Sequence, residues 1–155
     1  MRRLVILAWL AAVSDAHAQT EAPMTRDEMI AANAHLVTEK MSGAAGFDLG
    51  YDEASLAWVS GFIDRQREGW LADGSADKMR SILGSYAGAV VIAQHGGAWV
   101  QDDGGLAVEV REGFRVYPLN KVGKHIEHGE EDAIIGWYQV IGPMLSTGDA
   151  DETAR

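Results

Sequence analysis

The spacing of apolar residues changes its period along the chain, and this change limits the possible folds. In the first part of the chain, apolar side chains recur every three or four residues, which is typical of helices that bury one face. In the middle, Leu106, Val108 and Val110 alternate with Glu109 and Arg111, which is typical of a half-buried strand. Helical spacing then returns. Helices followed by a small sheet and one more helix indicate an α+β fold.

Two to three N-terminal helices are expected, over about 26–41, 53–70 and 76–94. Thr25 and Glu28 form a capping box at the start of the first helix, and Asp52 and Ser75 are suitable N-caps for the next two. The third helix is the most apolar, so we expect it, with Leu83, at the centre of the domain.

A three-stranded antiparallel meander is expected between about Trp99 and Tyr117, because turn residues interrupt the alternating pattern. Asp102 to Gly105 read as a four-residue hairpin loop, and Glu112-Gly113 as the second turn. Residues 119–129 are expected to be irregular or a single helical turn. One closing C-terminal helix then runs to Gly142-Pro143, so that a single α+β domain covers 25–145 and a disordered tail covers 146–155.

Two glycines interrupt the apolar third helix. Gly84 and Gly88 are four residues apart and therefore lie on one side of it. Each costs about 1 kcal/mol in a helix interior, so a compensating interaction is expected. The first interpretation is close packing of another helix or the sheet against the glycines, and the alternative is a ligand cleft lined by them.

The first 18 residues have the three parts of a secretory signal. Arg2 and Arg3 are basic, Leu4–Val13 is an unbroken apolar run, and Ala16 and Ala18 are small residues at a cleavage site. The alternative is a membrane anchor, but ten helical residues span about 15 Å, half of a hydrocarbon core of about 30 Å. We therefore expect cleavage after Ala18 and a periplasmic or secreted product.

Composition excludes several classes of function. The chain has 155 residues, no cysteine and a net charge of −10. Without cysteine there are no disulfides, thiolate nucleophiles, Cys-ligated zinc sites or lipidated cysteines. An acidic chain disfavours nucleic-acid and anionic-membrane partners, because both depend on basic surfaces.

Three segments carry a resemblance to a known family. They are the Leu83-Gly84-Ser85-Tyr86-Ala87-Gly88 run with the following Trp99, the Tyr117-Pro118-Leu119-Asn120-Lys121-Val122-Gly123-Lys124 run, and Gly129-Glu130-Glu131-Asp132 before an aromatic helix. In these segments the chain resembles a family of small bacterial domains of unknown function, some of them encoded near toxin–immunity loci. The resemblance covers about 49–141 and implies domain limits, but no activity and no cofactor.

A metal site is one chemical possibility. His125 and His128 are three residues apart, with several acidic side chains nearby, and imidazole with carboxylate suits zinc or another divalent ion. Gly129 argues against a continuous helix here, and the alternative interpretation is a solvated polar loop. If the metal site exists, the chain is a metal-dependent or acid–base enzyme.

A positive segment in an acidic chain is the second possibility. Residues 111–128 hold four basic and two acidic side chains. A surface for recognising a partner is therefore predicted here, formed by Trp99, Arg115, Asn120, Lys121 and Lys124. The alternative is that these cations pair with the protein's own carboxylates, which contributes little to stability.

The absence of catalytic motifs favours binding over catalysis. The chain has no Gly-x-Ser-x-Gly elbow and no His-Glu-x-x-His motif. The leading hypothesis is therefore an exported, non-catalytic module that binds a protein or peptide partner without a cofactor. The enzyme that uses His125 and His128 is the alternative.

Overall fold

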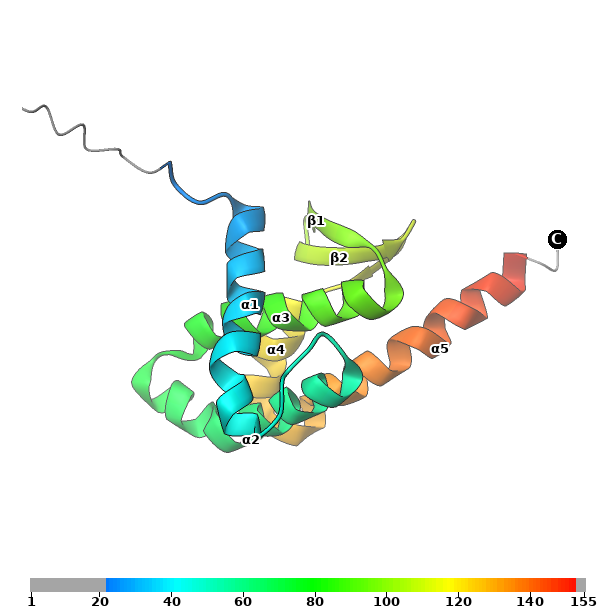
Figure 1. Cartoon of the computed structure of the whole chain (residues 1–155). Helices are drawn as coiled ribbons and strands as arrows, with labels where there is room; N and C mark the ends of the chain where they lie inside the picture. The colour runs from blue at the N-terminus through cyan, green and yellow to red at the C-terminus, as the bar shows by residue number, and fades with distance from the viewer. Residues whose placement is uncertain (1–21, 153–155) are drawn as a thin grey trace, which may run out of the picture.

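The computed structural model describes residues 22–152 and has the α+β class expected from the sequence (Figure 1). Five α-helices, one 3-10 helix and three strands follow one another in the described residues. In chain order they are α1 (Arg26–Ala45), α2 (Glu53–Asp73), α3 (Ala76–His95), β1 (Ala98–Asp102), β2 (Gly105–Arg111), β3 (Phe114–Val116), α4 (Pro118–His128), η1 (Gly129–Asp132) and α5 (Ile134–Glu152). The proposed signal peptide, residues 1–18, lies outside the described residues. Within 22–152, no helix is both long and apolar enough to cross a bilayer.

The predicted caps of the first two helices are present. The Thr25 hydroxyl accepts from the Glu28 amide while the Glu28 carboxylate accepts from the Thr25 amide, which completes the capping box. The Asp52 carboxylate accepts from the Ser55 amide at the start of α2. Ser75 precedes α3, but its side chain makes no capping bond; its own amide donates to Asp73 instead.

The centre of the domain is α3, which contacts α1, α2, α4, β2 and α5. Leu83, Tyr86, Val90 and Val91 of this helix are fully buried. The Tyr86 hydroxyl donates to the Gly50 carbonyl at 2.7 Å, so the one polar group of the ring is satisfied inside the core. Burial raises the pKa of this phenol well above its usual range, so it stays a donor at any physiological pH.

The two glycines of α3 allow close packing, as the first interpretation predicted. A Cβ at Gly84 would lie 2.7 Å from the Leu119 Cα on α4. A Cβ at Gly88 would overlap the Trp99 ring, with Pro118 also close. These positions are therefore filled by neighbouring protein groups, because α4 and the Trp99 side chain of β1 lie directly against the α3 backbone.

The expectation of irregular chain over 119–129 was wrong, because residues 118–128 form the eleven-residue helix α4. Pro118 is its first residue, where a missing amide hydrogen costs nothing. Val122 and Ile126 are buried against the core, one turn apart. Gly129 ends the helix with a positive φ of 76°, so it caps α4 rather than interrupting it. The prediction weighed the glycines and charges of this segment above its apolar spacing.

The sheet is antiparallel in the order β1-β2-β3. Asp102 pairs with Gly105, so the first loop contains two residues, Asp103 and Gly104, rather than the expected four. Gly105 has a φ of 110°, which the turn requires and other residues rarely adopt. The pairing of β2 with β3 is irregular between Glu109 and Arg111.

The last helix, α5, does not end at Gly142-Pro143 as predicted but continues through Pro143 to Glu152. Ile134, Tyr138 and Ile141 are buried against the body. Beyond them the helix runs outward, and its C-terminal end lies well away from the other elements in Figure 1. One side of α5 is therefore left uncovered.

Candidate ligand-binding groove

Most of the residues predicted to recognise a partner line one hollow, here called the α5 groove. Its first wall comes from β3 and α4 and consists of Phe114, Arg115, Val116, Tyr117, Asn120, Lys121 and Lys124. Its second wall comes from α5 and consists of Trp137, Val140, Ile141 and Met144. The groove has a volume of about 530 Å³, within the usual range for ligand sites.

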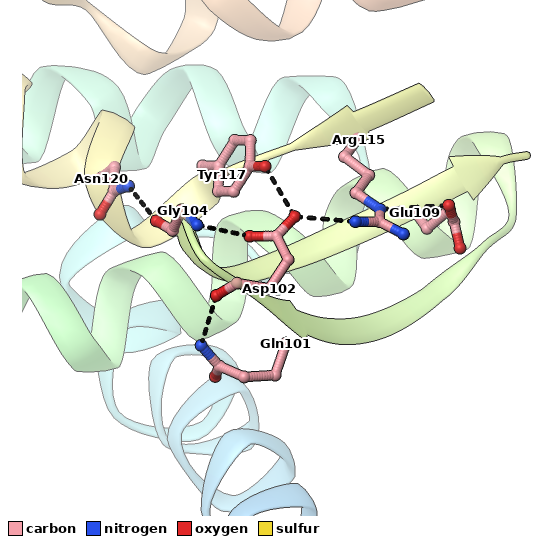
Figure 2. A network of polar contacts seen from close by, with 7 residues as sticks. All are labelled: Gln101, Asp102, Gly104, Glu109, Arg115, Tyr117 and Asn120. Carbon is pink, nitrogen blue, oxygen red and sulfur yellow. Dashed lines mark hydrogen bonds and ion pairs between the residues drawn. The ribbon is translucent and has the colours of Figure 1, made fainter. Parts of the chain in front are cut away.

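Arg115 is neutralised within the protein. Its Nη1 lies 2.9 Å from Asp102 Oδ2 and its Nε lies 3.1 Å from Glu109 Oε1. Figure 2 shows the guanidinium between these two carboxylates. Two negative charges therefore face one positive charge at this end of the groove.

Asp102 connects the hairpin loop to the first wall (Figure 2). Its Oδ1 accepts from the Gly104 amide at 2.8 Å, and its Oδ2 accepts from the Tyr117 hydroxyl at 2.8 Å. The bonds from Tyr117, and then those from Arg115 and Gly104, hold the pKa of Asp102 below its usual range, while the same carboxylate raises the pKa of Tyr117. The acid thus stays ionised and the phenol protonated, which keeps the loop attached to the wall.

Asn120 is also committed to internal contacts. Its Nδ2 donates to the Gly104 carbonyl at 3.3 Å and its Oδ1 accepts from Arg80 Nη2 at 2.8 Å. The side chain therefore joins the hairpin loop to α3 through Arg80. We interpret it as a support for the groove.

Lys121 pairs with Asp132 of η1 at 2.7 Å. His128 Nδ1 lies 2.6 Å from the other oxygen of the same carboxylate. Hydrogen bonding from Lys121, followed by that from His128, lowers the pKa of Asp132 from an ordinary 3.8 to about 2. The alternative interpretation of the positive segment, internal pairing, is therefore realised for Arg115 and Lys121.

Lys124 differs from these cations. It is exposed on α4, and it forms no ion pair or hydrogen bond with any residue from 22 to 147, the range in which side chains are described. Among the cationic residues on the described walls of the groove, its charge alone is uncompensated.

The α5 wall supplies an exposed apolar surface. Val140 is 49% exposed and Met144 is 54% exposed, although both are large apolar side chains. Trp137 is half-buried beside them. The sequence analysis ended the closing helix at Gly142-Pro143, so it missed this wall. The signal was present, because Trp137, Ile141 and Met144 continue the helical spacing past Pro143.

Trp99 does not line the α5 groove. Its ring fills the space above Gly88 and borders a second hollow, here called the α1 groove, of about 700 Å³ between α1, α3 and β1. The α1 groove is lined mainly by Ile30, Ile92, Tyr51 and several alanines. The predicted recognition surface therefore loses its tryptophan but keeps its other four members.

The two histidines predicted as metal ligands have separate surroundings. His125 is fully buried, with Nε2 at 2.8 Å from Asp64 Oδ1, while its Nδ1 accepts from the Ile134 amide at 3.3 Å. His128 has its side chain 52% exposed and pairs with Asp132. No group of three or more histidine or acidic side chains in the described part of the chain is placed to hold a metal ion.

Comparisons with known proteins give no relative: no family model, no curated protein and no solved structure matches the chain.

Proposed function

We propose that the protein is an exported, non-catalytic module that binds a protein or peptide partner in the α5 groove. The observation that carries this proposal is that Arg115, Asn120, Lys121 and Lys124, selected from the sequence, line one hollow together with an uncovered apolar wall. Charged and apolar surfaces side by side are typical of sites that recognise polypeptides.

The construction of the first wall supports binding. Asp102, Tyr117 and Asn120 hold the hairpin loop and the start of α4 in one arrangement. A wall held by its own hydrogen bonds loses little conformational freedom when a partner arrives, and this lowers the entropic cost of association.

The second wall supports a macromolecular partner. Val140 and Met144 are exposed on one side of α5, and Trp137 is half-buried beside them; aromatic residues and methionine are enriched in interfaces. The export signal read from residues 1–18 would place this partner in the periplasm or outside the cell.

Photocrosslinking in the native host tests the proposal. A photoreactive amino acid at position 140 should give a covalent adduct with another protein, and the same amino acid at Leu71 should not. Leu71 is the matched control because it is 46% exposed, close to Val140, and lies outside the α5 groove. Equal adducts from both positions, or none from position 140, would contradict a partner site in the groove.

Export is tested separately by intact-mass measurement of protein from the native host. The expected product lacks residues 1–18 and is recovered from the periplasm or the medium. A cytoplasmic species that retains Met1 would refute the export proposal and leave the groove proposal standing.

A further inference from the structure

We infer that the α5 groove receives a peptide segment carrying a single carboxylate beside bulky apolar side chains, and that Lys124 binds this carboxylate. The inference rests on the proposed function and specifies the chemistry of its ligand. Its basis is that the other cations lining the groove are already paired with carboxylates of the protein.

The charge of Arg115 and Lys121 is not available to a ligand. Arg115 faces both Asp102 and Glu109, and Lys121 faces Asp132, all at 2.7 to 3.1 Å. A ligand carboxylate at either cation would displace a bonded carboxylate or lie beside it, and like charges at such distances repel. These two cations face three carboxylates, so they help to define the shape of the wall and leave no positive charge for a ligand.

Lys124 can bind an anion without breaking any internal contact. It lies one turn after Lys121 on α4 and is exposed. The nearest acid along the helix on its C-terminal side, Glu127, lies 3.9 Å from His128 Nε2 and forms no pair with Lys124. An ammonium group of this kind acts as a point charge with three rotatable donors, which suits one carboxylate in various orientations.

The apolar wall specifies what accompanies the carboxylate. Val140 and Met144 are one turn apart on α5, and Trp137 lies one turn before Val140. The groove volume of about 530 Å³ accommodates several large side chains. Burial of such side chains removes apolar surface from water, so the apolar contacts favour the complex.

The charge of the whole protein limits the ligand to few negative charges. The chain carries a net charge of −10, so a strongly acidic segment would be repelled on approach. With one uncompensated cation in the described walls, a second or third ligand carboxylate gains nothing. The ligand is therefore an apolar segment with one acid, as opposed to an acidic tail.

Selection of random peptides displayed on phage against the full chain tests the inference. Enriched peptides should contain one aspartate or glutamate among large apolar residues. The same peptides should bind the Val140→Asp variant much more weakly than they bind wild type. Enriched peptides with several acids, or without any charge preference, would overturn the inference and preserve a binding groove. If no selected peptide binds wild type more tightly than it binds Val140→Asp, both the inference and the proposed function are overturned.

A charge swap measures the role of Lys124. The best single-acid peptide should bind Lys124→Ala about fivefold more weakly than wild type, which is the effect expected of an exposed ion pair. Lys124→Glu should bind it still more weakly and should prefer the same peptide with lysine in place of its acid. The control is Lys40→Ala, at an exposed lysine of α1 outside the groove, which should bind like wild type. Equal affinity of wild type and Lys124→Glu for both peptides would overturn the inference.

Discussion

The two walls of the α5 groove are held in place by different means. The wall formed by β3 and α4 is packed onto α3 at Gly84 and Gly88 and is bonded to the hairpin loop through Asp102, Tyr117 and Asn120. The α5 wall is buried only along Ile134, Tyr138 and Ile141, and its groove side is open. The first wall is thus part of the folded core, whereas the second is a surface added to it. The first wall thus contributes to stability and also carries Lys124, whereas the exposed side of the α5 wall contributes to recognition alone.

The strongest test of this difference is Leu83→Asp. Leu83 is fully buried in α3, the helix against which α4 packs, and an unpaired carboxylate there costs several kcal/mol. We expect loss of the folded state in circular dichroism and thermal melting. The control is Leu71→Asp at a side chain that is 46% exposed, which should fold. A folded Leu83→Asp protein would show that α3 is not the centre of the domain.

Two glycine-to-alanine substitutions, one in α3 behind the first wall and one in α5, compare the packing of the two walls directly. Gly84→Ala should destabilise the protein by about 1–3 kcal/mol, because the new methyl group would lie 2.7 Å from the Leu119 Cα. Gly136→Ala in α5 meets nothing within 4 Å and should stabilise it by about 0.5–1 kcal/mol through helix propensity. Urea denaturation measures both. If both substitutions raise the unfolding free energy, or both lower it, the proposed difference in packing is contradicted.

Acid should weaken the attachment of η1 to the first wall. The pKa of Asp132 is about 2 in the folded protein against an ordinary 3.8, so its contribution to stability is present above about pH 4 and is lost as the pH falls toward 2. Asp132→Asn should therefore show a smaller decrease in unfolding free energy between about pH 5 and pH 2 than wild type. An identical decrease in both proteins would mean that the Lys121–Asp132 pair does not form in solution.

The smallest effect on stability is expected for a substitution on the exposed side of the α5 wall. Val140→Ser removes an apolar group that is already 49% exposed, so the unfolding free energy should change by less than about 0.5 kcal/mol. The same substitution should weaken partner binding, measured by the yield of the photocrosslinked adduct from a neighbouring position on α5. A large loss of stability would show that Val140 belongs to the core and not to a binding surface.

Local patterns predicted most of the fold. The capping box at Thr25, the cap at Asp52 and the change of apolar period placed the first three helices and the strands within a few residues. The prediction failed for α4 and for the end of α5. In both places a residue that usually ends a helix, Gly129 or Pro143, was given more weight than the apolar spacing around it. Tertiary contacts with the core decide such cases, and these are not visible in a local pattern.

Only part of the α5 groove could be predicted from the sequence, and the reason is physical. Charge counting along the chain found Arg115, Lys121 and Lys124 because they are close in sequence. It could not show that Arg115 and Lys121 are neutralised, because Asp102 and Asp132 reach them only through the fold. Trp99 was grouped with these cations although it borders the α1 groove, and sequence order could not show this, because its contact with Gly88 joins elements that are separate in the sequence.

The open side of α5 has a consequence for how the protein can change over generations. Substitutions at Val140 or Met144 alter the surface offered to a partner while leaving the interior intact. Substitutions at Gly84 or Gly88 disturb the interior first. Lineages that carry this fold are therefore free to acquire new partners by varying one face of a single helix, without having to restabilise the scaffold each time.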